Sequence, residues 1–168
     1  MNRIQAQKIV ERIQNIPLYL HASAFHLNMR MEKILPEGLL DIASEQKLKG
    51  VKVHVLDGES QSLSCADDAR LQKFGEKAHS LGLDVHIETS ASDAETIDTA
   101  VAIALKSGAS SVRFYPRYEG HLAEVLAQVK QDIQYIKAHY QHSGLTFTLE
   151  QHEDLKSHEL VRLIEEAD

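Results

Sequence analysis

The chain has 168 residues, of which 43% are hydrophobic and 26% charged, and its formal net charge is −7. This composition is ordinary for a globular protein with one core, and no apolar run is long enough to span a membrane. The negative charge, without a visible cluster of lysine or arginine, argues against a nucleic-acid partner. The single cysteine, Cys65, excludes an internal disulfide framework, and together with the polar N-terminal segment it favours a cytoplasmic protein.

Helices and short strands alternate along the chain after a first helix expected near residues 3–14. Apolar and β-branched runs predict strands over 17–23, 51–57, 84–89, 111–117 and 145–151. Apolar residues with helical spacing, such as Leu71, Phe74 and Ala78, occupy the intervals between them. Strands that alternate with helices imply a parallel sheet.

Glycines and capping residues mark the ends of the predicted helices. Gly50, Gly82, Gly108 and Gly144 each follow a helical stretch and precede a strand. Glycine is favoured at such a position because it enters the left-handed conformation at little cost. The sequence from Ser92 to Glu95 has the spacing of a capping box, which predicts that the next helix begins there.

The last four predicted strands each have one apolar face and one polar face. The polar faces carry His54, His86, Glu88, Arg113, Tyr115, Thr148, Glu150 and His152. A doubly wound sheet would bury these groups beneath helices, which is costly. A barrel with a polar lumen accommodates them, and so would an open sheet with one solvated face. We therefore expect an α/β fold over residues 1–168, a single domain that forms a partial (βα) barrel of about five parallel βα units.

Glu150 ends the last strand, at the edge where parallel α/β folds bind their ligands. A carboxylate near imidazole groups is a ligand set for a divalent cation, and a surface or helix-capping glutamate is the alternative. Two interpretations also stay open for Arg113, which would bind a substrate phosphate or carboxylate, or form an ion pair with Glu88. The facing direction of His21 is ambiguous because the register of the first strand is uncertain.

The segment "LTFTLEQHEDLKSHELVRLIEEAD", residues 145–168, resembles the fifth βα unit of the xylose isomerase-like barrel superfamily, the sugar (phosphate) isomerases and epimerases. In that superfamily a strand ends on a metal-binding glutamate, and a short polar loop opens the next helix. The matching loop and helix residues here are Asp154, Leu155, Ser157, Glu159 and Leu160. Residues 26–55 resemble the first helix and second strand of the superfamily, and the resemblance covers residues 16–168.

By this resemblance Glu150 is the first of four ligands of a divalent metal (Mn, Mg, Co or Zn). The metal would support proton transfer next to the carbonyl of a sugar or sugar phosphate. His54, His86, Arg113 and His152 are the expected substrate contacts. The other metal ligands of the superfamily come from later strands, and a complete barrel takes about 250 residues. We therefore expect an N-terminal portion of an enzyme of carbohydrate metabolism, inactive by itself.

Two other functions stay open at this point. A metal-dependent phosphodiesterase similar to the abasic-site endonucleases shares the superfamily, although it would need a basic surface for DNA. A partial barrel would also suit a non-catalytic ligand-binding or assembly module. In each case the two unpaired edges of the sheet would favour a homo-oligomer, and no membrane partner is expected.

Overall fold

Five parallel strands form the centre of the molecule in a computed structural model, which describes residues 3–151 and 155–167. The strands are β1 (Tyr19–His21), β2 (Gly50–His54), β3 (Asp84–Glu88), β4 (Ser111–Phe114) and β5 (Thr146–Leu149). The helices are α1 (Arg3–Gln14), α2 (His26–Arg30), α3 (Pro36–Glu45), α4 (Asp68–Ser80), α5 (Ala94–Lys106), α6 (Leu122–Tyr140) and α7 (Ser157–Ala167). In the part of the chain so described, every helix is too short or too polar to span a membrane.

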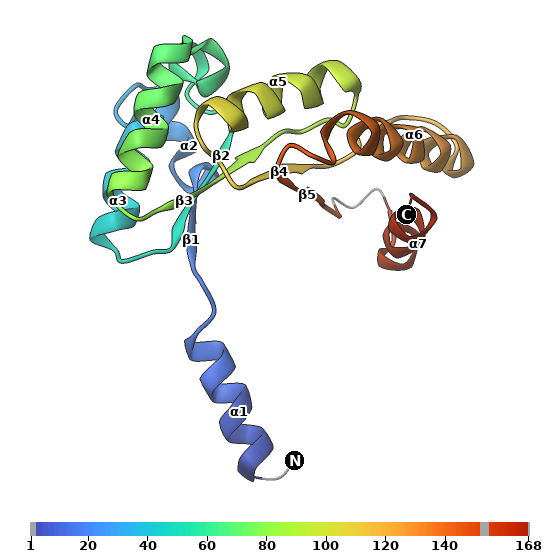
Figure 1. The fold of residues 1–168 in the computed structure, drawn as a ribbon, viewed down its shortest axis with the longest axis horizontal. Coiled ribbons are helices and arrows are strands. Elements are labelled where there is room, and N and C mark those ends of the chain that lie inside the picture. Colours follow the sequence, from blue (N-terminus) through green and yellow to red (C-terminus); the bar gives the residue numbers. More distant parts are fainter. Residues whose placement is uncertain (1–2, 152–154, 168) are drawn as a thin grey trace.

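The order of the strands distinguishes a barrel from a doubly wound sheet. The sheet runs β1-β2-β3-β4-β5, and each strand is parallel to its neighbour. A doubly wound sheet reverses its strand order at a switch point, whereas this sheet adds every strand on the same side. The helices α3 to α6 cover one face of the sheet and leave the other face open (Figure 1). The fold is therefore a partial α/β barrel, as the alternation of polarity predicts.

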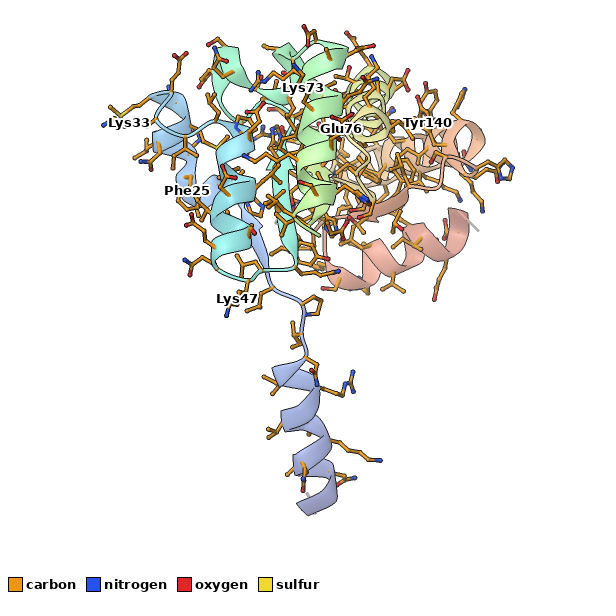
Figure 2. The ribbon with its side chains drawn as sticks, turned by 60° about the vertical axis from the view of Figure 1, so that its left-hand side comes forward. Phe25, Lys33, Lys47, Lys73, Glu76 and Tyr140 are labelled. Atoms are coloured by element: carbon orange, nitrogen blue, oxygen red, sulfur yellow. The ribbon has the colours of Figure 1, made fainter. Side chains whose placement is uncertain are left out.

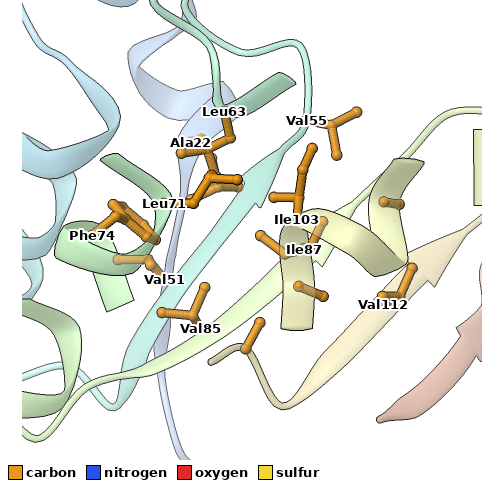
Figure 3. Packing of buried hydrophobic residues seen from close by; sticks show 14 of the residues in the cluster. Ala22, Val51, Val55, Leu63, Leu71, Phe74, Val85, Ile87, Ile103 and Val112 are labelled. Carbon is orange, nitrogen blue, oxygen red and sulfur yellow. The ribbon is translucent and has the colours of Figure 1, made fainter. Parts of the chain in front are cut away.

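The core lies between the apolar face of the strands and these helices. Val53, Ile87 and Val112, from three neighbouring strands, are fully buried. They belong to one hydrophobic cluster with Phe74 of α4 and Ala104 of α5 (Figure 3). The polar residues of α4, such as Lys73 and Glu76, point away from the sheet (Figure 2). A second, smaller cluster joins α6 to α7 through Val125, Val129, Leu155, Leu160 and Leu163.

The predicted strands and the first helix are confirmed, although the strands are shorter than their apolar runs. The β1 strand ends at His21 because the next residues, Ala22–Phe25, form a 3₁₀ turn. The β4 strand ends at Phe114, two residues before Pro116, which cannot donate a backbone hydrogen bond. Helix α1 stands away from the sheet in both views of the whole chain (Figures 1 and 2).

Gly50 was predicted to take a left-handed conformation after a helix, and this prediction is wrong. The left-handed residue after α3 is Lys47, with φ 55°, while Gly82 and Gly108 take left-handed conformations with φ 67° and 64° as expected. Gly50 instead opens β2, where a Cβ atom would overlap the carbonyl oxygen of Asp84 on β3. The glycine is needed for the close approach of two strands rather than for its backbone angles.

We predict that Gly75→Ala destabilises the fold although it adds a better helix former to α4. A Cβ atom at Gly75 would lie 2.7 Å from the carbonyl carbon of Ser107 at the end of α5. The two helices would have to separate, at a cost of about 1–3 kcal/mol in the free energy of unfolding. The matched control is Gly38→Ala in α3, where the nearest atom, Ile34 Cγ2, is 3.4 Å away. Urea unfolding should show no loss of stability for the control. Equal losses of stability in the two variants would contradict the close approach of α4 and α5 at Gly75.

Candidate functional site

A continuous network of charged side chains crosses the carboxyl end of the sheet on its polar face. Arg113 of β4 donates from Nε to Glu88 Oε1 at 2.9 Å, and its Nη2 lies 2.8 Å from Glu88 Oε2. Its Nη1 forms an ion pair with Glu150. On the other side of Glu88, His21 Nε2 lies 2.9 Å from Oε2. We call these four residues the charged cluster; they come from β1, β3, β4 and the residue after β5.

The register of the strands explains why these residues meet. Glu88 is paired with Arg113, and Arg113 is paired with Thr148 on β5. Residues at paired positions and residues two apart along a strand share one face of the sheet. Glu150 follows Thr148 by two positions, and its backbone N–H donates to the carbonyl oxygen of Phe114 at 2.8 Å. The hydrogen-bonded pairing of β4 with the residues at the end of β5 therefore places the Glu150 side chain on the same face as Arg113.

Glu88 is the electrostatic centre of the charged cluster, with only 1% of its surface exposed. Burial would raise the pKa of this carboxyl, but the hydrogen bonds from His21 and Arg113 outweigh burial and lower the pKa to about 2. The Nδ1 atom of His21 accepts the backbone N–H of Ser23 at 3.2 Å. The Nδ1 atom therefore carries no proton in this arrangement, and Nε2 faces Glu88 Oε2 at 2.9 Å. A buried charge held on both sides in this way gives the site a fixed geometry.

His54 contributes a neutral imidazole beside the charged cluster. It is paired with Glu88 in the register of β2 and β3. Its Nδ1 accepts the backbone N–H of Leu56 at 3.2 Å, which places the ring proton on Nε2. Burial lowers the pKa of His54 below its usual value, so the ring is uncharged at neutral pH. The ring can therefore donate one hydrogen bond without adding charge to the site.

His86 lies in a separate polar group, closer to the amino ends of the strands. Its Nε2 is 3.0 Å from Asp84 Oδ2, which also accepts a hydrogen bond of 3.0 Å from the Tyr19 hydroxyl. The Tyr19 and His86 rings are 4.6 Å apart. A cavity of about 350 Å³ connects this group with the charged cluster. Its lining includes Lys52, His86, Glu88, Arg113, Thr146 and Thr148.

The structure thus brings three of the predicted site residues, His54, Arg113 and Glu150, to one end of the polar face and leaves His86 further from it. The ion pair between Arg113 and Glu88, one of the two interpretations from sequence, is present. His152 lies outside the described residues. The pairing of His21 with Glu88 was not predicted, because a strand of three residues gives too short a pattern to fix its faces.

The residues present do not by themselves fit a divalent metal ion. Between residues 3–151 and 155–167, no group of three His, Cys, Asp or Glu side chains is arranged to hold one. The carboxylate of Glu150 is instead paired with the guanidinium of Arg113. A single carboxylate beside a fixed cation has too few donors for a tight metal site.

A buried carboxylate anchors the loops that follow β3 and β4 near this site. Asp132 of α6 accepts hydrogen bonds of 2.6 Å from the hydroxyls of Ser92 and Tyr118. Burial, followed by the hydrogen bond to Asp132, raises the pKa of Tyr118 to about 12. The prediction that Ser92 caps α5 is wrong, because Asp93 accepts the Thr96 N–H and Ser92 is used by Asp132.

We predict that Asp132→Ala lowers the free energy of unfolding by about 2 kcal/mol, because two hydroxyls lose their acceptor inside the protein. The matched control is Asp98→Ala on α5. Asp98 also accepts from two hydroxyls, those of Tyr135 and Tyr140, but it is exposed to solvent. Its loss should cost less, since water replaces the acceptor. Equal effects in thermal unfolding would show that burial of the Asp132 group is unimportant.

These features define a partial barrel with an ion-paired polar site at the carboxyl ends of its strands, and comparisons place it among known proteins. No protein-family model matches the chain. YihM, an uncharacterised protein of Escherichia coli (strain K12), is 66% identical over 163 residues, which cover 97% of this chain and 50% of YihM. The chain therefore spans about half the length of the curated relative it matches.

Solved structures with this fold are xylose isomerase-like barrels. A D-psicose 3-epimerase, crystallised in the presence of D-fructose, matches with a TM-score of 0.64 and 12% identity, over 78% of this chain and 54% of that protein. A xylose isomerase domain containing protein of Salmonella typhimurium LT2 matches with a TM-score of 0.65 and 14% identity, over 89% of this chain and 56% of that protein. At these identities the likeness shows the fold alone, and the fold is that of part of a xylose isomerase-like barrel.

Proposed function

We propose that the polar face of this partial barrel is half of the sugar site of an isomerase or epimerase. The observation that carries the proposal is the charged cluster at the carboxyl ends of the strands, the edge where (βα) barrels bind their substrates. The fold shared with a D-psicose 3-epimerase supports a sugar as the ligand. The reaction would be a proton transfer next to a sugar carbonyl, as the superfamily resemblance implies.

Each residue of the site has a proposed role that follows from its surroundings. His54 donates Nε2–H to a sugar hydroxyl, because its Nδ1 is already occupied by a backbone N–H. Arg113 orients Glu150 toward the lumen and offers one of its two remaining N–H groups to a substrate oxygen. We also propose His86 and His152 as substrate contacts, with His86 deeper in the lumen.

Glu150 is proposed as one donor to a divalent metal, which would supply Lewis-acid chemistry at the sugar oxygens when bound. This chain offers too few donors to hold that metal alone, so the remaining ligands would have to come from outside the described residues. The alternative of a DNA phosphodiesterase has no such support, because the net charge of −7 opposes binding to DNA.

The test is the interconversion of ketoses and aldoses, followed by chromatography with added manganese or magnesium. We expect the 168-residue chain alone to give only the background rate. We expect turnover when the barrel is completed by the other half of YihM, and loss of that turnover in Glu150→Gln. Turnover of the completed barrel that is unchanged in Glu150→Gln would contradict the proposed role of Glu150, and no turnover on any sugar would contradict the function.

A further inference from the structure

We infer that a row of polar side chains on the amino-terminal side of the charged cluster is a binding subsite for an oxyanion, such as a phosphate group. We call this row the inner layer; it consists of Lys52, His86, Ser111 and Thr146. The subsite does not depend on the proposed function, whereas assigning the oxyanion to a sugar substrate rests on that function.

The inner layer is one level of the parallel register across four strands. Lys52 of β2 is paired with His86 of β3, which is paired with Ser111 of β4. Thr146 of β5 continues the row beside Ser111. Paired positions share one face of the sheet, and all four residues line the cavity of about 350 Å³. Arg113 follows Ser111 by two positions, so the charged cluster lies about 7 Å further along the strands.

Hydrogen-bonding groups of the inner layer lack partners within residues 3–151 and 155–167. Ser111 is only 7% exposed, yet its hydroxyl makes no hydrogen bond to this part of the chain, and neither does the hydroxyl of Thr146. An ionised carboxylate can only accept, so His86 donates from Nε2 to Asp84 and keeps Nδ1 free as an acceptor. A nine-tenths buried hydroxyl that faces a cavity is expected to bond to a ligand or to water.

The charge of Lys52 favours an anion as that ligand. The side chain is half-buried, its Nζ lies 6.0 Å from the centroid of the Tyr19 ring, and no carboxylate of the described residues is within ion-pair distance. Asp84, two positions before His86, accepts hydrogen bonds from Tyr19 and His86 instead. An ammonium group that is partly withdrawn from water is stabilised by an anionic partner. Its N–H groups and the two hydroxyls would donate to phosphate oxygens, and His86 Nδ1 would accept from a protonated one.

The charged cluster is a poorer place for the same anion. Arg113 already faces two carboxylates, those of Glu88 and Glu150, so an added anion would meet a negative net charge. Glu88 also borders the cavity, but its carboxylate is paired with Arg113 at 2.8 Å. The geometry therefore favours Lys52 over Arg113 as the partner of an anionic group. A phosphate held at the inner layer would direct an attached sugar toward the charged cluster.

The experiment is isothermal titration calorimetry of the 168-residue chain with inorganic phosphate, fructose 6-phosphate and fructose, in a buffer that contains chloride. We expect saturable binding of one inorganic phosphate per chain, tighter binding of fructose 6-phosphate, and weaker binding of fructose. Lys52→Met should weaken phosphate binding by about tenfold or more, and Ser111→Ala by about threefold or more. Lys52→Arg keeps the charge and should retain most of the affinity. The matched control is Lys73→Met, which removes an exposed charge on the far side of α4 (Figure 2).

The inference would be overturned if neither phosphate compound binds saturably, or if Lys52→Met and Ser111→Ala bind phosphate as well as the control. Circular dichroism of each variant checks that the fold is retained. Equal affinities for inorganic phosphate and fructose 6-phosphate would support the subsite but assign it to free phosphate rather than to a substrate. The sugar assay separates this result from the proposed function. Phosphate binding with the expected variant dependence, without turnover of any sugar, supports the subsite and contradicts the function; turnover without phosphate binding does the opposite.

Discussion

Arg113→Met is expected to lower the free energy of unfolding by about 3–5 kcal/mol, because it leaves a buried carboxylate without its main partner. Arg113 makes two contacts below 3 Å with Glu88, whose side chain is 1% exposed, and a further ion pair with Glu150. Methionine retains much of the side-chain volume but supplies no charge. Urea unfolding at neutral pH measures the change.

Two further variants identify the cause of this loss. Arg117→Met removes an exposed arginine three residues before Gly120 and should change stability by less than about 0.5 kcal/mol. The double variant Arg113→Met with Glu88→Leu removes both charges and should be more stable than Arg113→Met alone, since no unpaired charge stays buried. A double variant that is less stable than Arg113→Met would show that packing, rather than the buried charge, explains the loss.

Acidification is expected to remove about 3 kcal/mol of stability that depends on Glu88. The folded pKa of about 2 lies below the ordinary value of 4.5. A carboxyl whose pKa is lowered by folding stabilises the protein fully above its unfolded pKa and loses that contribution as the pH falls toward the folded pKa. Each pKa unit corresponds to about 1.4 kcal/mol. The window is therefore between about pH 4.5 and pH 2.

The measurement compares Glu88→Gln with the unmodified chain by urea unfolding at several pH values. The difference in the free energy of unfolding should be largest at neutral pH and should shrink as the pH falls through that window. Glu76→Gln, on the exposed side of α4, is the control and should match the unmodified chain at every pH (Figure 2). A Glu88→Gln difference that stays constant with pH would contradict an ionised, ion-paired Glu88.

Sequence patterns were sufficient for the sheet and for part of the site. The alternation in β4 places Val112 and Phe114 in the core and Arg113 on the polar face, and all three lie there. The ion pair of Arg113 with Glu88 could be anticipated, because the alternation places both residues on the polar face of neighbouring strands. Alternation of apolar and polar residues predicts which way a strand's side chains face wherever one face of the sheet is buried.

Other features depend on contacts between distant segments, which a local pattern does not contain. The position of His21 required the register of a three-residue strand. The need for glycine at position 75 arises from the approach of α5, not from an unusual φ. Two adjacent capping residues, Ser92 and Asp93, are equivalent in sequence, and only the buried Asp132 distinguishes them.

The central claim is that Glu150 lies in a site for proton transfer next to a sugar carbonyl. Its most direct test is solvent exchange in D₂O, with manganese, on the barrel completed by the other half of YihM. We predict that deuterium enters the substrate at the carbon beside the carbonyl, and that Glu150→Gln abolishes this exchange while the protein stays folded. Exchange that proceeds unchanged in Glu150→Gln, or no exchange on any ketose or aldose, would contradict the account.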